Sequence, residues 1–279
     1  MKKLITLFCI AIIAVSIILP LIYANNTAQA AGDVALPILM YHSVLKSKNG
    51  TYIVSPSQLE ADFKRIIAEG YAAVTSEQVI NYVDGKGSLP DKPIMITFDD
   101  GHYNNIYYAK PLLEKYGLKA VFNVIGKFSD FTTNSGDVDN PNYSHATWDE
   151  IAELSNGSVM EIGNHTYNMH NYKPRFGIAQ KYGESDEEYV AALKKDIGRL
   201  QKILFDCTGK ECRVLAYPFG KYGSLAEKTL IEMGFRMMFT CNEGVSYIKR
   251  GEPKSLYKLK RINRSGKYDV DTVMNKINK

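Results

Sequence analysis

The sequence predicts an α/β fold: a distorted or incomplete (β/α) barrel of seven to eight parallel strands. Short apolar segments alternate with amphipathic segments from residue 36 onward, in seven or eight strand–helix units. The segment 94–98 is apolar at nearly every position, which is typical of a parallel strand buried on both faces. Unusual polar residues follow several apolar segments, where α/β barrels carry their chemistry.

The elements follow from these patterns in order along the chain. The predicted strands cover residues 37–41, 72–75, 94–98, 119–125, 159–163, 213–217, 237–241 and 256–262. The predicted helices cover 55–69, 76–83, 104–116, 147–154, 186–204, 224–233 and 270–277. Helix starts are marked by Ser55 before Pro56 and by Thr147 three residues before Glu150. The polar stretch 127–144 is interpreted as a loop insertion, and no linker divides residues 31–279 into two domains.

The first 30 residues have the pattern of a signal peptide or an N-terminal anchor. Lys2 and Lys3 precede an apolar run over 4–24, and the small-residue pattern of Ala28 and Ala30 fits cleavage after Ala30. The run is also about long enough to span a bilayer, so an uncleaved anchor with membrane association stays open. Either way, we expect the folded part to be secreted or at the cell surface, outside the cytoplasm.

Composition and cysteine content narrow the class of protein. The 279 residues are 45% hydrophobic, enough for one large core, and the net charge of +4 includes two lysines of the leader. Because no basic cluster stands out, we expect no nucleic-acid partner. Outside the cytoplasm, Cys207 and Cys212 are close enough in sequence to permit a disulfide, whereas Cys241 lies in an apolar run and is expected to be a buried thiol.

Two adjacent carboxylates end the strand predicted at 94–98. Asp99 and Asp100 are like charges at the rim of a core, and such a pair needs a cation or metal if both are to stay ionised. Gly101 then lets the backbone turn sharply. An N-cap role explains one aspartate but not both, so we interpret the pair as functional.

A second polar group contains two histidines. His165 and His170 are five positions apart, which is not the spacing of one helix face and favours a strand end with its loop. Together with Asp100 they give one carboxylate and two imidazoles, a ligand set for a divalent metal that leaves positions open for water and substrate. This set accepts zinc, cobalt, nickel or iron, and we favour Zn²⁺.

These segments resemble motifs of a known family. Residues 97–101, Thr-Phe-Asp-Asp-Gly, are similar to the first motif of the polysaccharide deacetylases, the carbohydrate esterases with a NodB-type domain. Residues 163–166 followed by His170 resemble the second motif, with the histidine spacing of the branch that acts on poly-β-1,6-N-acetylglucosamine. Residues 215–220 resemble a degenerate third motif, and the resemblance spans about 36–265.

The resemblance implies roles for individual residues. Asp99 would be the general base, and Asp100, His165 and His170 would bind the metal. Phe219 would help to form the oxyanion hole through its backbone N–H, with Tyr217 beside it at the substrate.

Two residues would substitute for parts of the family pattern that are missing here. No histidine follows His170, so the C-terminal general acid is absent, and His42 after the strand 37–41 would take that role. The third motif lacks its arginine, and Arg261 would hold Asp99 instead. His102 and His145 receive no role.

The expected function is therefore a metal-dependent hydrolase of amide C–N bonds. It would remove N-acetyl groups from N-acetylglucosamine polymers (a biofilm polymer, peptidoglycan or chitin oligomers) and release acetate, and we expect it to be a monomer. Two alternatives stay open: an O-acetyl esterase acting on xylan or cell-wall sugars, and a carbohydrate-binding pseudoenzyme, which the missing arginine and histidine would explain.

Overall fold

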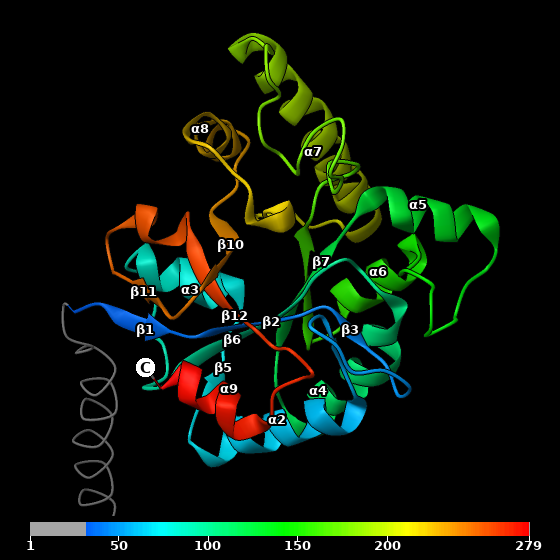
Figure 1. The fold of residues 1–279 in the computed structure, drawn as a ribbon. Helices are drawn as coiled ribbons and strands as arrows, with labels where there is room; N and C mark the ends of the chain where they lie inside the picture. Colours follow the sequence, from blue (N-terminus) through cyan, green and yellow to red (C-terminus); the bar gives the residue numbers. More distant parts are fainter. Residues whose placement is uncertain (1–31, 279) are drawn as a thin grey trace, which may run out of the picture.

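The computed structural model describes residues 32–278, and within them seven parallel strands close into a barrel (Figure 1). In spatial order these strands are β2 (Ile38–Tyr41), β12 (Leu259–Asn263), β10 (Met237–Glu243), β9 (Val214–Ala216), β8 (Met160–Asn164), β7 (Ala120–Val124) and β6 (Pro93–Phe98). An eighth parallel strand, β5 (Ala72–Ala73), pairs with β6 outside the ring. The predicted (β/α) barrel is confirmed, whereas the predicted leader, residues 1–30, lies outside the described residues.

The barrel is closed unevenly, which explains its distortion. β2 pairs with β6 over four residues, from Ile38 opposite Met95 to Tyr41 opposite Phe98. The seam between β8 and β9 has a single pair, Asn164 opposite Leu215. All six residues of β6 are buried, as its continuous apolar sequence predicted. Asp99 and Asp100 therefore follow a fully buried strand at the carboxyl end of the barrel.

Helices follow the strands and surround the barrel (Figure 1). They are α2 (Pro56–Ala68), α3 (Ser76–Val83), α4 (Lys110–Tyr116), α5 (Gly126–Ser135), α6 (Trp148–Asn156), α7 (Asp186–Thr208), α8 (Ser224–Glu232) and α9 (Val270–Ile277). A π-helical turn (Asn105–Ala109) precedes α4, and 3₁₀ turns lie at Pro218–Gly220 and Pro253–Leu256. The capping signals operate as predicted, since Ser55 and Thr147 accept hydrogen bonds from Gln58 N and Glu150 N.

Residues 127–144 are a partial correction to the sequence prediction. The first part forms α5 rather than a loop, although its polar sequence has no side-chain cap at its start. Its first turn is held by tertiary contacts, because Gly126 N and Lys127 N donate to Thr166 O and Tyr167 O. These contacts join residues about 40 positions apart, so no local pattern announced the helix.

Short strands outside the barrel also escaped prediction. β1 (Val34–Leu36) pairs with β11 (Ser246–Ile248) in an antiparallel ribbon, and β3 (Ser43–Val44) pairs with β4 (Ile53–Val54). Strands of two or three residues are too short to show an alternating pattern.

The cysteines differ in part from expectation. Cys207 and Cys212 are free thiols, and Cys241 is exposed rather than buried. Cys241 lies where β10 leaves the core, so the apolar run before it gave a misleading signal. Among the described helices, none is both long and apolar enough to cross a membrane.

Candidate active site

The predicted site residues gather at the carboxyl end of the barrel. Asp99 and Asp100 follow β6, His165 follows β8, and Phe219 lies in the turn after β9. His170 reaches the same place from the loop that continues beyond His165. Because all seven strands are parallel, their carboxyl ends meet at one mouth, which brings these distant residues together.

Asp100, His165 and His170 form a compact ligand group. The Nε2 atoms of both histidines lie 3.5 Å from Asp100 Oδ1, and one donor atom from each of the three residues lies within 4.8 Å of the others. Asp100 Oδ1 is buried and has no hydrogen-bond partner among the described residues. A buried carboxylate oxygen without a partner is costly unless a cation neutralises it.

The histidines present the nitrogen that a metal needs. His165 Nδ1 lies 2.8 Å from the carbonyl oxygen of Ala216, which can only accept a hydrogen bond. Nδ1 therefore carries a proton, so Nε2, which lies towards Asp100, is the nitrogen available to a metal. Burial and the neighbouring His165 lower the pKa of His170 to about 4, so this ring is neutral at pH 7. The group fits a divalent cation.

Three site residues other than glycine have backbones in the left-handed region. Their φ angles are 73° at Asp100, 71° at Thr166 and 56° at Phe219. Such conformations cost free energy, especially for a β-branched residue, and they cluster at functional sites. At Gly101, also at φ 73°, a Cβ would lie 3.2 Å from Val124 Cα, so the turn after the two aspartates has no room for a side chain.

Asp99 is held in a buried ion pair. Arg261 donates to both carboxylate oxygens, at 2.8 and 2.7 Å, and Asn123 Nδ2 donates to Oδ1 at 2.8 Å. Burial alone would raise the pKa of Asp99, but the charge and hydrogen bonds of Arg261, together with the nearby His165 and His42, outweigh it and hold that pKa well below its usual range. Asn123 was missed by the sequence analysis because it lies inside an apolar strand without a motif.

His42 follows β2 at the same mouth. Its Nδ1 is buried without a hydrogen-bond partner among the described residues, and its ring lies 4.7 Å from that of Tyr52. Burial lowers the pKa of His42, against the opposing charges of Asp99 and Asp100. The structure thus brings this histidine into the electrostatic field of both aspartates.

Tyr217 was predicted to lie at the substrate, but its side chain points into the core instead. The ring is fully buried, and its hydroxyl lies 3.0 Å from Met238 Sδ. The side chain cannot contact a substrate from there, because it belongs to the hydrophobic core and its ring stacks on that of Tyr222, with the ring centroids 4.8 Å apart. Phe219, in contrast, is half-buried, and its ring lies 4.3 Å from that of His170.

His102 and His145, which received no role, lie beside the site. His102 Nε2 is 3.7 Å from Asp100 Oδ2, whereas His165 Nε2 lies next to the other carboxylate oxygen, Oδ1. The His102 ring lies 4.8 Å from the His145 ring, which in turn lies 4.6 Å from Phe128. The sequence did contain a signal for this contact, because His102 comes two residues after Asp100 and Gly101 between them turns the chain back.

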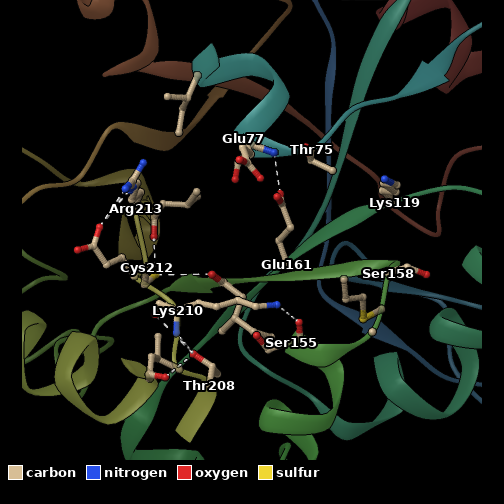
Figure 2. A pocket seen from close by; sticks show the side chains of 18 of the residues that line it. Thr75, Glu77, Lys119, Ser155, Ser158, Glu161, Thr208, Lys210, Cys212 and Arg213 are labelled. Atoms are coloured by element: carbon tan, nitrogen blue, oxygen red, sulfur yellow. Dashed lines mark hydrogen bonds and ion pairs between the residues drawn. The ribbon is translucent and has the colours of Figure 1, made fainter. Parts of the chain in front are cut away.

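A cavity of about 600 Å³ lies elsewhere, at the amino ends of β8 and β9 (Figure 2). Several of its charged groups already have partners: Glu161 accepts from Ser76 N at 2.7 Å, and Arg213 bonds Glu211 at 3.0 Å. Lys210 donates to the Ser155 carbonyl. The cavity lies at the amino ends of the strands, whereas the catalytic residues of parallel barrels lie at the carboxyl ends, so it is not the candidate active site.

Known proteins are similar to much of this chain. At 26% identity, 74% of the chain matches 66% of a poly-β-1,6-N-acetyl-D-glucosamine N-deacetylase of Staphylococcus aureus strain MRSA252. The Escherichia coli K12 enzyme of the same name is 25% identical over 69% of the chain. The chain spans only 31% of the length of that E. coli protein.

Solved structures share the fold. A de-N-acetylase from Aggregatibacter actinomycetemcomitans superposes with a TM-score of 0.73 at 25% identity, covering 87% of this chain and 99% of the other. The IcaB structure from Ammonifex degensii gives 0.71 at 23% identity, with coverages of 89% and 98%. The sequence profile described as Polysaccharide deacetylase matches residues 86–238, more than half of the chain, including both aspartates and both ligand histidines. The chain belongs to the polysaccharide deacetylase family, a family of hydrolases, as its motifs predicted.

Proposed function

We propose that this protein is a metal-dependent N-deacetylase of poly-β-1,6-N-acetylglucosamine that acts outside the cytoplasm. The observation that carries the proposal is the Asp100–His165–His170 group directly beside the buried, ionised Asp99. The names of the S. aureus and E. coli relatives support the choice of substrate. The location rests on the apolar leader of residues 4–24 and its small-residue end.

The residues of the chain divide the hydrolysis into proton transfers and charge stabilisation. A divalent cation held by Asp100, His165 and His170 would supply Lewis acidity towards the acetyl carbonyl and would lower the pKa of water. Asp99 accepts a proton from the water that attacks the carbonyl carbon, and the Arg261 pair keeps this carboxylate ionised and oriented. The backbone N–H of Phe219 donates to the developing oxyanion.

Collapse of the tetrahedral carbon then breaks the C–N bond. The amine is a poor leaving group unless it is protonated, so His42 donates a proton to that nitrogen. Acetate and a glucosamine unit are the products. Burial lowers the pKa of His42, which makes its protonated form a stronger acid towards the departing nitrogen.

Acetate release tests the proposal. The full chain, supplied with zinc, cobalt or nickel, is incubated with β-1,6-linked N-acetylglucosamine oligomers, chitin oligomers and acetylated xylan. We expect release from the β-1,6 oligomers and an about hundredfold or greater loss in Asp100→Asn, because several kcal/mol of charge stabilisation disappear. The matched control is Asp206→Asn, on the exposed side of α7, which should retain full activity.

The outcomes separate the alternatives. Faster release from acetylated xylan than from any N-acetyl substrate would identify an O-acetyl esterase. Sugar binding without turnover under every metal would identify a carbohydrate-binding pseudoenzyme. Either result would overturn the proposed N-deacetylase.

A further inference from the structure

Three aromatic rings form an exposed ledge beside the metal-ligand group. Tyr172, Phe176 and Phe219, here called the aromatic ledge, have ring centroids 4.5, 5.5 and 5.1 Å apart in the three pairs. Tyr172 is 72% exposed and Phe176 is 39% exposed. Single exposed apolar side chains are common, but large aromatic side chains that gather in one patch indicate a binding site.

The ledge is continuous with the candidate active site. The ring of Phe219 lies 4.3 Å from that of His170, a member of the ligand group, and 4.5 Å from that of Tyr172. Tyr172 itself comes two residues after His170. A polymer whose acetyl group sits at the ligand group therefore meets these rings with an adjoining part of its chain.

The loop that presents the rings is firmly held. Arg175 Nη1 donates to Glu184 Oε2 and to Ala179 O, both at 2.8 Å. Gly177 N donates to Asn171 O at 2.9 Å, and a Cβ at Gly177 would lie 2.6 Å from Pro218 O. The loop thus packs directly on the turn that carries Phe219, and little ordering entropy remains to oppose ligand binding.

The chemistry of the ledge favours a neutral sugar ring. Aromatic faces pack against the apolar C–H faces of pyranose rings, and a tyrosine offers a hydroxyl at the edge of such a contact. Lys221 Nζ lies 5.4 Å from the centroid of the Phe176 ring and places one positive charge at the ledge. A glucosamine ammonium is therefore disfavoured there relative to N-acetylglucosamine.

We propose that the aromatic ledge is a glycan subsite, with Tyr172 as its main contact, for a pyranose ring adjoining the sugar that is deacetylated. This inference rests on the proposed function for its substrate class. Its occupant is a neutral N-acetylated sugar of the same polymer, because the ledge begins at the ligand group, where a bound polymer must continue.

Binding measured by calorimetry tests the subsite on the full chain after metal chelation, so that the ligand is not consumed. The probe is a β-1,6-linked N-acetylglucosamine trisaccharide, compared with the glucosamine trisaccharide. Tyr172→Ala should weaken the N-acetylated trisaccharide about three- to tenfold, the range of one aromatic contact. Tyr172→Phe should bind within about twofold of the wild type, since the ring is kept.

Tyr182→Ala is the matched control. This tyrosine belongs to the same loop and is fully exposed, but it makes no ring contact with the ledge among the described residues. It should bind like the wild type, and thermal unfolding of each variant checks the fold.

Several outcomes would overturn the subsite. They are equal binding by Tyr172→Ala and wild type, equal losses in Tyr172→Ala and Tyr182→Ala, preference for the glucosamine trisaccharide, or no binding by the wild type. Acetate release is measured separately. Tyr172-dependent binding without acetate release would refute the proposed hydrolysis while leaving the subsite in place.

Discussion

Replacing Arg261 by methionine tests how the base is held. The guanidinium is fully buried and makes two hydrogen bonds to Asp99, one to Thr97 Oγ1 at 3.1 Å and one to the Thr240 carbonyl at 2.9 Å. Methionine has similar length and no charge. Arg261→Met therefore leaves the Asp99 carboxylate buried with Asn123 as its remaining hydrogen-bond donor.

The expected loss is large relative to the stability of a typical domain. Removing one partner of a buried ion pair costs about 3–5 kcal/mol, out of about 5–15 kcal/mol for folding. The pKa of Asp99 should also rise, because burial then acts without the opposing arginine charge. The acid limb of the pH–rate profile for acetate release should accordingly move to higher pH.

Urea unfolding at pH 7 measures the loss, with Asp99→Asn/Arg261→Met as the double variant. The double variant should recover much of the stability, since no uncompensated charge stays buried. A second buried pair supplies the control: Arg264 bonds Asp62 at 2.6 and 3.0 Å, away from the ligand group. Arg264→Met should lose comparable stability yet keep its activity at temperatures where it is folded.

The reasoning fails if Arg261→Met unfolds within about 1 kcal/mol of the wild type. It also fails if the double variant loses as much unfolding free energy as the sum of the losses in Asp99→Asn and Arg261→Met. If Arg264→Met loses activity to the same extent as Arg261→Met while both are folded, Arg261 has no special role in orienting the base.

Further predictions concern the metal, a surface pair and a buried glycine. Asp100→Asn should bind zinc at least tenfold more weakly in a chelator competition while its thermal midpoint without metal stays within a few degrees; unchanged affinity would contradict the ligand assignment. Hydrogen bonds from Lys115 and Tyr116 lower the pKa of Glu60 to about 2. The ionised Glu60 should therefore stabilise the fold above pH about 4.5, and this stabilisation should be lost as the pH falls towards 2. Glu60→Gln should therefore lower the thermal midpoint at pH 7 but not at pH 2, and a pH-independent difference would refute the linkage. Gly163→Ala should cost about 1–3 kcal/mol in urea unfolding, because its Cβ would lie 2.0 Å from Asn123 Oδ1; a neutral effect would contradict the packing.

The sequence by itself determined the fold class and the ligand group. Alternating apolar and amphipathic segments specify strands and helices locally, and a parallel barrel brings every strand end to one mouth. Asp100 and His165 could therefore be placed together before any coordinates, since each ends an apolar run. Their identity as a carboxylate and an imidazole then indicated a metal.

Only the tertiary structure decided which groups surround those residues. The sequence suggested Arg261 as the residue that holds Asp99, but the two are 162 positions apart, and the geometry of the pair depends on how β12 and β6 approach across the closed barrel. Asn123 beside Asp99, His102 beside Asp100, and the burial of the Tyr217 ring all depend on strand register and loop packing. Except for the local pair of His102 and Asp100, these are contacts between distant segments, and no local pattern of residues specifies them, because side-chain direction at a barrel mouth is set by the neighbours that pack around it.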